Sequence, residues 1–493
     1  MAIASAAGAM VAGITGVLVH VEVDVSNGLP AVQVVGLADT AVGESRARVR
    51  TAIGNSNLLW PSSRVTIGLS PANLSKRGTG LDLAIALAIL AVTDQVPARS
   101  EVLAFGELGL DGTVRGVPGA IVAAQCARAH DRTRIVVSVA NAAEVSLVPG
   151  IEVIPVRDLA HLVMVLRGDA EPAAVPLPER VPAGEPLDFA DVHGHHLAKR
   201  SLEIAAAGGH HAMFIGPAGV GKTMLAQRVP GILPELDDAS ALEVTAVASL
   251  LGEEISELRR TPPFVAPHHT STQVAMVGGV KPGLITRAHR GVLFLDEVPE
   301  FDRRVLDTLR QPLEAGAITV SRADRHVTMP AQFQLLLAAN PCPCGWSGTD
   351  DARCTCTSLA RRRYLQRISG PLADRIDIRA RLTQPTIVDH DEVAEPSHHI
   401  AERVRAARER AARRFTGTPW RVNAHVPGKA FAATWPMDAD AREELWRAIT
   451  ANVLSLRGAD RVARLAWSIA DLAERDQPNR ECVAEAMELR GQW

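Results

Sequence analysis

Aromatic side chains are scarce in this 493-residue chain, where they make up 3% of the residues and include a single Tyr. The core must therefore be built mainly from Ala, Val, Leu and Ile. A hydrophobic content of 47% is ordinary for a globular protein and supplies enough of them. The scarcity also argues against rows of aromatic rings that stack on unpaired bases.

Neither a strong net charge nor a long apolar run is present. The formal net charge is -3, so contact with a nucleic acid would need a local basic surface. No stretch reaches about 18 uninterrupted apolar residues, and the apolar N-terminal segment lacks a basic region before it. These absences predict a cytoplasmic protein with no signal peptide, no membrane span and no membrane partner.

Cysteine is sparse but unevenly placed. Four of the six cysteines crowd together as Cys342, Cys344, Cys354 and Cys356. In a reducing compartment such clustering indicates a metal rather than disulfides. Two C-x-C pairs can close a tetrahedral thiolate site for structural Zn²⁺, although C-x₂-C is the commoner spacing. Four reduced, unligated thiols in a loop are the alternative.

One segment carries a complete phosphate-binding motif. The pattern G-x-x-x-x-G-K-[ST] is matched by Gly216, Pro217, Ala218, Gly219, Val220, Gly221, Lys222 and Thr223. The glycines let backbone N–H groups surround phosphate oxygens, the lysine reaches the β and γ phosphates, and the threonine hydroxyl holds Mg²⁺. An apolar strand is expected over His211–Ile215 and a helix over Met224–Arg228. The segment predicts binding of ATP with Mg²⁺.

Two later strands end in polar residues suited to the same site. The apolar run Gly291–Leu295 ends in Asp296, expected at the Mg²⁺ ion, and Glu297, expected to polarise the attacking water. The run Gln334–Ala339 ends in Asn340, which could orient that water or contact the γ-phosphate. The alternatives are a surface acidic pair and an ordinary turn at an Asn-Pro dipeptide.

Several further segments carry a family resemblance. They are Asp188–Gly194, Ala205–His210, Arg290–Glu297, Tyr364–Leu372 and Gly370–Asp377. Together with the phosphate motif they resemble the magnesium chelatase-like branch of AAA+ ATPases, and more closely the ComM/YifB family, over nearly the whole chain. The resemblance implies an α/β fold with an AAA+ P-loop core, a Lon-protease-like (ribosomal S5 domain 2-like) α/β domain before it and a helical lid after it.

The resemblance also implies a function. It predicts an ATP-hydrolysing homo-oligomeric ring, a hexamer, that acts on single-stranded or branched DNA as a helicase or translocase. Branch migration in recombination or natural transformation, with recombination proteins as further partners, is the implied role. The alternatives are a chelatase-type motor that drives metal insertion into a porphyrin and a scaffold whose nucleotide sets its assembly state. Intact Lys222, Asp296, Glu297 and Arg375 argue against an inactive ATPase.

Two arginine assignments come only from the resemblance. Arg375 resembles the arginine finger that completes a neighbouring subunit's site, a role that suits a guanidinium. An ion pair with Asp374 or Asp377 is its alternative. Arg464 resembles the second sensor arginine of the lid, with Arg461 as the other choice because the two share a helix face. A solvated basic face is the alternative there.

Composition divides the chain into four parts. The linker, residues 168–187, holds five prolines between Gly168 and Pro186 and separates an N-terminal domain, residues 1–167, from the ATPase core, residues 188–385. Residues 386–493 are expected to be helical. The expected elements are strands at Val19–Val25, Arg64–Leu69, Val102–Leu108 and Arg134–Val139, and helices at Leu81–Leu90, His399–Phe415, Ala441–Leu454 and Ala459–Glu474.

The N-terminal domain resembles a protease that has lost its catalytic residues. Ser75–Ala84 and Phe105–Arg115 are similar to Lon proteases, which use a Ser–Lys dyad. Gly78 stands where the serine should be and Ile121 where the lysine should be, so peptide hydrolysis is not expected. Lys76 and Arg77 are candidate DNA contacts, and a solvated turn is the alternative.

Two insertions are expected to contact a polymer in a central pore. Ala317–Ser321 and His326–Met329 read as a hairpin, and Arg322 and Arg325 near its tip could contact phosphates. Pro267–Ile285 resembles the insertion in the second helix of this AAA+ branch, and its glycines favour a mobile loop. Surface loops with incidental basic residues are the alternative.

Overall fold

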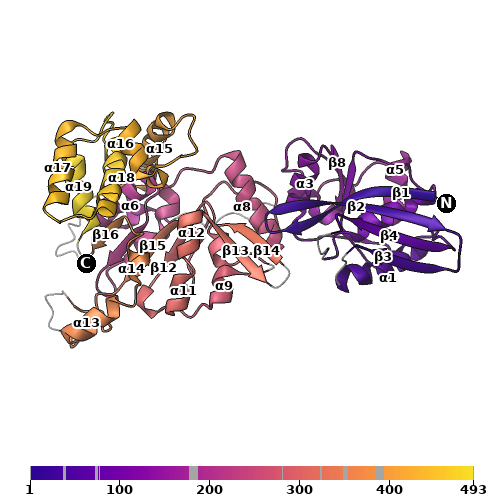
Figure 1. The fold of residues 1–493 in the computed structure, drawn as a ribbon, viewed down its shortest axis with the longest axis horizontal. Helices are drawn as coiled ribbons and strands as arrows, with labels where there is room; N and C mark the ends of the chain where they lie inside the picture. Colours follow the sequence, from indigo (N-terminus) through magenta and orange to yellow (C-terminus); the bar gives the residue numbers. More distant parts are fainter. Residues whose placement is uncertain are drawn as a thin grey trace.

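The computed structural model describes residues 2–36, 40–72, 76, 78–176, 187–279, 281–322, 325–347, 353–383 and 394–491. An N-terminal α/β part and a larger part, made of a second sheet and the C-terminal helices, follow each other along the long axis (Figure 1). No helix among the described residues combines the length and the apolar character needed to cross a bilayer.

A seven-stranded sheet forms the centre of the N-terminal part, in the order β3-β4-β2-β1-β5-β8-β9. Its strands are β1 (Ala2–Ala12), β2 (Thr15–Ser26), β3 (Ala31–Val35), β4 (Arg64–Ser70), β5 (Val102–Phe105), β8 (Arg134–Ser138) and β9 (Glu152–Val156). Strand β2 pairs antiparallel with β1 and β4, and the other neighbours are parallel. In β2, Val19, Val21 and Val23 are buried while His20 and Glu22 are exposed, the period-two pattern of a strand with one covered face.

Helices cover this sheet. They are α1 (Thr40–Asn55), α2 (Asp82–Val92), α3 (Ala120–Ala129), α4 (Val139–Val145) and α5 (Leu159–Arg167), and a small hairpin joins β6 (Glu107–Leu108) to β7 (Val114–Arg115). Helix α2 is buried almost all round, which explains its uninterrupted apolar sequence. Its first residue, Asp82, is fully buried and is compensated by Arg48, whose Nε lies 2.9 Å from the carboxylate.

A five-stranded parallel sheet forms the centre of the larger part, in the order β11-β12-β15-β10-β16. The strands are β10 (Ala212–Ile215), β11 (Phe264–Val265), β12 (Val292–Leu295), β15 (Gln334–Ala339) and β16 (Ile378–Arg381). Leu336 and Ala338 of β15 join one hydrophobic core, and the alternate Leu335, Leu337 and Ala339 join another on the opposite face. Both faces are covered, so the strands read as continuous apolar runs.

The remaining elements of the larger part are mostly short. The central helices are α6 (His196–Gly208), α7 (Lys222–Gln227), α8 (Asp238–Leu251), α9 (Gln273–Val277), α10 (Leu284–Arg287), α11 (Arg303–Asp307), α12 (Arg310–Ala315), α13 (Ser358–Leu365) and α14 (Gly370–Ala373). Single 3₁₀ turns lie at Phe189–Asp191, Val229–Ile232, Val298–Glu300 and Asn423–His425. A hairpin of β13 (Ala317–Arg322) and β14 (Arg325–Pro330) leaves the sheet before β15.

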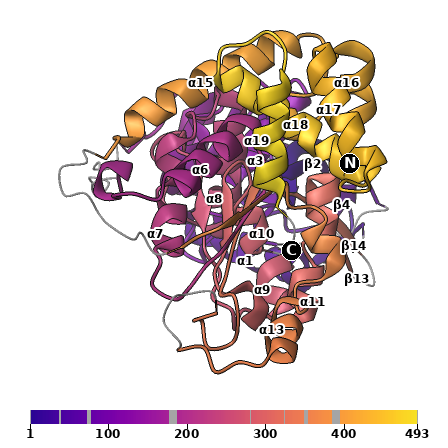
Figure 2. The same ribbon diagram turned by 90° about the vertical axis from the view of Figure 1, so that its left-hand side faces the viewer.

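The C-terminal helices pack directly on one face of the central sheet. They are α15 (Ser397–Arg414), α16 (Gly428–Thr434), α17 (Ala439–Thr450), α18 (Leu456–Leu472) and α19 (Arg480–Arg490). Val404 of α15 and Leu465 of α18 share one hydrophobic core with Phe214 and Phe294 of the sheet. Figure 2 shows these helices gathered at the top of the molecule, with α9, α11 and α13 at the bottom.

The N-terminal part contacts the central part at helix α8. Leu242, Ala246 and Leu250 of α8 share a hydrophobic core with Ile121 and other residues of α3. The N–H group of Gly119 donates to the carbonyl of Ser249 at 3.0 Å. A Cβ added at Gly13, in the β1–β2 turn, would lie 3.0 Å from the carbonyl oxygen of Thr328, so this turn touches the β13–β14 hairpin.

Most of the expected elements are confirmed with shifted ends, and three differ. The strand expected over Val102–Leu108 divides at Gly106 into β5 and β6. The N-terminal segment, for which no strand was expected, forms β1 and pairs along its length with β2. In the segment Pro267–Ile285, expected to be a loop, Met276 of α9 and Ile285 of α10 are fully buried, because apolar side chains anchor both short helices on the sheet.

The expected linker is described only in its first part. Residues 168–176 stay close to the N-terminal sheet, since the N–H group of Ala173 donates to the carbonyl of Pro155 at 3.0 Å. His161 also contacts the carbonyl of Glu171 through Nε2 at 3.1 Å. Residues 177–186 lie outside the described residues.

Candidate nucleotide site and its surroundings

The phosphate motif forms a loop between β10 and α7. Gly219 and Gly221 have φ values of +77° and +89°, a region that L side chains rarely adopt. A Cβ at Gly219 would meet open space, so the positive φ rather than crowding requires glycine there. At Gly216 a Cβ would lie 2.8 Å from the carbonyl oxygen of Leu382, so any side chain would collide with the backbone.

Lys222 is held inside this loop. Its Nζ donates to the carbonyl oxygens of Gly216 at 2.7 Å and Pro217 at 2.8 Å, and to Oδ1 of Asn340 at 3.0 Å. Burial lowers the pKa of Lys222, while the nearby carboxylates of Asp296 and Glu297 act in the opposite direction. The ammonium group is thus kept beside the carboxyl ends of β10, β12 and β15.

The two carboxylates expected at the end of β12 lie at the same edge. The Thr223 hydroxyl donates a short hydrogen bond to Oδ2 of Asp296, and the N–H group of Glu297 donates to Oδ1 of Asp296 at 2.9 Å. Glu297 itself has φ of +51°, a rare value for a residue with a side chain that is typical of functional turns. Its Oε2 lies 3.7 Å from Nδ1 of His269.

These residues fit a Mg²⁺–nucleotide site. Oxygen ligands such as a hydroxyl and a carboxylate are what Mg²⁺ prefers, and Thr223 and Asp296 are already in contact. Positive φ at two glycines shapes a backbone concavity of the kind that binds phosphate. Lys222 supplies the positive charge next to it. The structure therefore brings Lys222, Thr223, Asp296, Glu297 and Asn340 together at one edge of the sheet.

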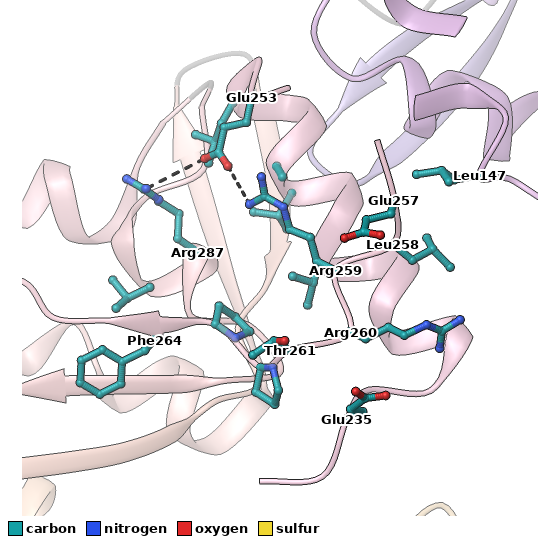
Figure 3. Close-up of a pocket in the computed structure, with 17 residues that line it drawn as sticks. Leu147, Glu235, Glu253, Glu257, Leu258, Arg259, Arg260, Thr261, Phe264 and Arg287 are labelled. Atoms are coloured by element: carbon teal, nitrogen blue, oxygen red, sulfur yellow. Dashed lines mark ion pairs between the residues drawn. The ribbon is translucent and has the colours of Figure 1, made fainter. Parts of the chain in front are cut away.

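Cavities also border the central sheet. One of about 520 Å³ borders the start of the phosphate loop and is lined by Gly216, Pro217 and Leu382 among others. Another of about 850 Å³ lies between α8 and the loop that follows it, close to Leu147 of the N-terminal part (Figure 3). In that cavity Glu253 pairs with Arg259 at 2.7 Å and with Arg287 at 4.0 Å, so the charge of Glu253 is compensated.

The arginines assigned by resemblance lie at the opposite end of the sheet. Arg375, Arg461 and Arg464 line a cavity of about 460 Å³ that also includes His211, the residue before β10. Because the phosphate loop follows β10, these arginines are at the amino ends of the strands and the loop is at their carboxyl ends. The structure does not bring them to the phosphate loop of the same chain.

Each of these arginines has different partners. Arg375 pairs with Glu314 of α12, rather than with Asp374 or Asp377, and its Nη1 donates to the carbonyl of Pro371 at 2.6 Å. Burial and three neighbouring arginines lower its pKa. Arg461 pairs closely with Asp377. Arg464 has an Nε that is buried without a hydrogen-bond partner among the described residues.

A buried polar network lies behind this cavity, where α6 meets α18. His210 contacts Oδ2 of Asp377 through Nδ1 at 3.1 Å and Oγ of Ser468 through Nε2 at 2.7 Å. Its ring and the Ser468 side chain are fully buried. Hydrogen bonds from His210 and the charge of Arg461 outweigh burial and hold the pKa of Asp377 well below its usual range. Because His210 and Ser468 are fully buried, this Ser–His–Asp contact stabilises the packing of α18 on the core.

The four clustered cysteines lie next to the phosphate loop. Their Sγ atoms are all within 4.8 Å of one another. None of the four forms a disulfide. The loop between β15 and α13 that carries them touches the phosphate loop, since the N–H group of Ala218 donates to the carbonyl of Gly345 at 3.3 Å.

Lys76 is not a DNA contact, contrary to the sequence-based expectation. Its side chain is fully buried, and its Nζ donates a short hydrogen bond to the carbonyl of Pro71. The aliphatic part of a lysine can fill a core when the ammonium group finds a buried carbonyl. Arg77 lies outside the described residues. Ile121, which the resemblance aligns with the Lon lysine, is buried in α3 and offers no base.

The expected hairpin is present, but its tip is not fully described. The backbone of β13 and β14 pairs from Ala317–Pro330 to Arg322–Arg325. Ala323 and Asp324 lie outside the described residues, and so do the side chains of Arg322 and Arg325.

Comparison with known proteins shows which families this chain is similar to. Three sequence families match in order: subunit ChlI of magnesium chelatase over residues 21–141, magnesium chelatase subunit ChlI over 188–389 and its C-terminal region over 394–490. An uncharacterized protein of Mycobacterium tuberculosis is 44% identical over 99% of each chain. The protein YifB of Escherichia coli is 40% identical over 97% of this chain and 95% of its own length. The competence protein ComM of Haemophilus influenzae is 39% identical over 97% of this chain and 95% of its own length.

The chain belongs to the ComM/YifB family of magnesium chelatase-like proteins. The mixed α/β fold with a parallel sheet agrees with the AAA+ fold of this family. Membership makes the protein a chelatase-like AAA+ motor and indicates ATP with Mg²⁺ as its nucleotide.

Two residues of this ComM/YifB protein were missed by the sequence reasoning. His269 was noted only as part of a loop, yet it faces Glu297. Tyr364, the only tyrosine, lies in a segment that carries the family resemblance, but no motif marks it as a site residue. It is buried near Glu300, which follows Glu297 by one turn, and burial raises its pKa above the usual range. A lone tyrosine in a chain so poor in aromatics was the available signal.

Proposed function

We propose that this ComM/YifB protein is an ATP-hydrolysing ring motor that acts on DNA as a helicase or translocase. The observation that carries the proposal is the separation of two half-sites within one chain. One half-site, at the carboxyl edge of the sheet, consists of Lys222, Thr223, Asp296, Glu297 and Asn340. The other half-site, at the amino edge, contains Arg375. A ring in which the arginine edge of one subunit faces the phosphate loop of the next would complete each site.

The chemistry of each half supports this arrangement. Bound Mg²⁺ would neutralise phosphate charge between Thr223 and Asp296. Glu297 accepts a proton from the attacking water, Lys222 binds the β and γ phosphates, and Asn340 orients the water. Arg375 and Arg464 stabilise the transition-state charge from the neighbouring subunit. Among the described residues the buried Nε of Arg464 has no hydrogen-bond partner, which favours an anionic partner from outside the chain. Arg375 would exchange its ion pair with Glu314 for such a partner.

DNA is the proposed polymer, and branch migration in recombination or natural transformation is the proposed role. A relative that spans nearly the whole chain is called a competence protein. Scarce aromatics favour contacts with the phosphate backbone over base stacking. A hexamer in the cytoplasm, a Lon-like N-terminal fold and a lid formed by residues 386–493 belong to the same proposal. Structural Zn²⁺ at Cys342, Cys344, Cys354 and Cys356 is a separate proposal, which does not depend on the activity.

Two variants test the shared active site. Glu297→Gln should keep ATP affinity and lose turnover, and Arg375→Ala should lose turnover through the neighbouring site. Neither variant hydrolyses ATP alone, but a mixture can form sites with an intact Glu297 from one subunit and an intact Arg375 from the other. Mixing the two should therefore restore part of the activity. Glu443→Gln, on the exposed face of α17, is the matched control and should behave as the unchanged protein.

Other outcomes of these experiments would contradict parts of the proposed function. Full turnover by Glu297→Gln would remove Glu297 from catalysis. Loss of activity in Arg375→Ala without any recovery in the mixture would place Arg375 in its own chain's fold. ATP hydrolysis should also rise with single-stranded or forked DNA and fall steeply with salt. An equal rate with and without DNA would favour the chelatase-type motor or the scaffold instead.

A further inference from the structure

The four clustered cysteines have the spacing of a tetrahedral thiolate metal site. The Sγ atoms of Cys342, Cys344 and Cys354 are 3.3, 3.7 and 3.6 Å apart in pairs, and Cys356 completes the group. A Zn²⁺ ion with four Zn–S bonds of about 2.3 Å places its sulfurs about 3.8 Å apart. A disulfide would need about 2.05 Å. The N–H group of Ser347 donates to Sγ of Cys342 at 3.4 Å, a bond that stabilises a thiolate.

The loop of the first cysteine pair contacts the phosphate loop. Gly345 accepts a hydrogen bond from the N–H group of Ala218 at 3.3 Å. A Cβ at Gly345 would lie 3.3 Å from the Cβ of Ala218, and φ at Gly345 is +82°. Asn340, two residues before Cys342, accepts from Lys222 at 3.0 Å. The loop thus reaches the nucleotide site from two positions.

The segment after the second pair contacts the other half of the same site. Arg361 of α13 donates to the carbonyl of Cys356 at 3.1 Å, which joins the pair to the helix. Arg367, just after α13, donates to the carbonyl of Pro299 at 3.1 Å and pairs with Glu300 at 3.4 Å. Pro299 and Glu300 belong to the 3₁₀ turn that follows Glu297.

We infer that the four cysteines bind one Zn²⁺ ion that ties the phosphate loop to the turn after Glu297. We call residues 341–347 and 353–367 the cysteine module. Its two C-x-C pairs carry separate contacts to the two halves of the nucleotide site, and the metal joins them. The effect on nucleotide binding rests on the proposed ATP site, whereas the metal site itself does not.

Metal analysis tests the site directly. The purified full-length protein should carry one zinc per chain by elemental analysis. Cys344→Ala and Cys356→Ala should lose it, and the matched controls Cys126→Ala and Cys482→Ala, whose thiols lie elsewhere in buried positions, should keep it. No bound metal in the unchanged protein, a bound iron in place of zinc, or full zinc in both cluster variants would overturn the assignment.

Nucleotide affinity tests the coupling. The Kd for a fluorescent ATP analogue should rise about five-fold when zinc is released from the folded protein with a mercurial and a chelator, the value of roughly one lost hydrogen bond. Gly345→Ala should keep one zinc per chain yet weaken the nucleotide by a similar factor, because its Cβ presses on Ala218. Gly345→Ala therefore tests the coupling even if the cysteine variants do not fold.

The outcomes separate the two proposals. Zinc present and unchanged affinity after both its release and Gly345→Ala would overturn the coupling alone. No ATP binding by the zinc-loaded, unchanged protein would overturn the proposed function and leave the zinc site standing.

Discussion

At the scale of single residues, the same side chain has different roles because its neighbours differ. Lys76 and Lys222 are both buried, and burial lowers the pKa of each. Lys76 has one backbone carbonyl as partner, so it is part of the N-terminal core. Lys222 faces two carboxylates and a strand-end amide, so it is poised for phosphate.

Two histidines that line the cavity at the amino ends of the strands, half-buried His211 and exposed His425, predict sensitivity to acid. Desolvation by the surrounding protein lowers the pKa of both His211 and His425 to about 4. Their unfolded value is about 6.5, so the unfolded chain binds more protons as the pH falls from 6.5 towards 4. The free energy of unfolding is therefore highest above pH 6.5 and should fall as the pH is lowered towards 5, with a larger share from half-buried His211 than from exposed His425.

The measurement is urea unfolding at pH 7 and pH 5. The variant His425→Gln should lose less stability between these two values than the unchanged protein does. His20→Gln, an exposed position on β2, is the control and should leave the loss unchanged. Equal losses in His425→Gln and the unchanged protein would contradict the assignment of this sensitivity to His425.

At the scale of elements, helix α18 joins the C-terminal helices to the core through buried polar contacts. Asp471 accepts two hydrogen bonds from Arg414, at 2.8 and 2.6 Å, and one from Asn423 at 2.9 Å. The guanidinium of Arg414 also lies 4.3 Å from the ring centre of Trp467. Each buried charge is thus compensated, which allows a charged pair inside the helical layer.

Removing one partner of this pair should be costly. Asp471→Ala leaves Arg414 buried without a counter-charge, and we expect the free energy of unfolding to fall by about 3 kcal/mol. Chemical denaturation followed by circular dichroism measures it. Glu443→Ala, which breaks an exposed ion pair with Arg447 on α17, should produce no measurable change. An equal change in the free energy of unfolding for both variants would show that the buried pair does not stabilise the fold more than an exposed pair does.

At the scale of the whole molecule, α8 couples the N-terminal part to the motor core. Its buried leucines share a core with α3, and the nearby β1–β2 turn touches the β13–β14 hairpin. The N-terminal part is therefore joined to the core at two places, helix α8 and the β13–β14 hairpin.

Disrupting that junction should separate the two parts. Leu250, whose side chain lies 3.2 Å from the position of a Cβ on Gly119, is buried at the junction. Leu250→Asp should divide a joint thermal transition into two in scanning calorimetry, because a buried carboxylate would have no partner there. Leu456→Asp, at a leucine that is 72% exposed, is the matched control and should not change the transitions. A single, unshifted transition for Leu250→Asp would show that the two parts are not coupled through α8.

Much of the nucleotide site followed from local patterns. The glycine spacing, the apolar strands and the polar residues after them predicted which side chains would meet, because parallel strands bring their carboxyl ends to one edge. The incorrect predictions also have a physical cause. Lys76 looked like a surface residue because its buried carbonyl partner cannot be read from nearby residues. The Ala-rich strand β1 has only two β-branched residues, Ile3 and Val11, and its strand conformation is stabilised by pairing with β2 and β5.

By itself, the sequence determined the phosphate loop, the acidic and amide strand ends, the cysteine cluster and the family, because these depend on residue type at short spacing. Tertiary structure alone decided that Arg375 and Arg464 lie at the other end of the sheet and that the cysteines contact the phosphate loop. Both facts depend on how strands of distant sequence are ordered in the sheet. That order is set by the packing of two apolar faces, which no short segment encodes.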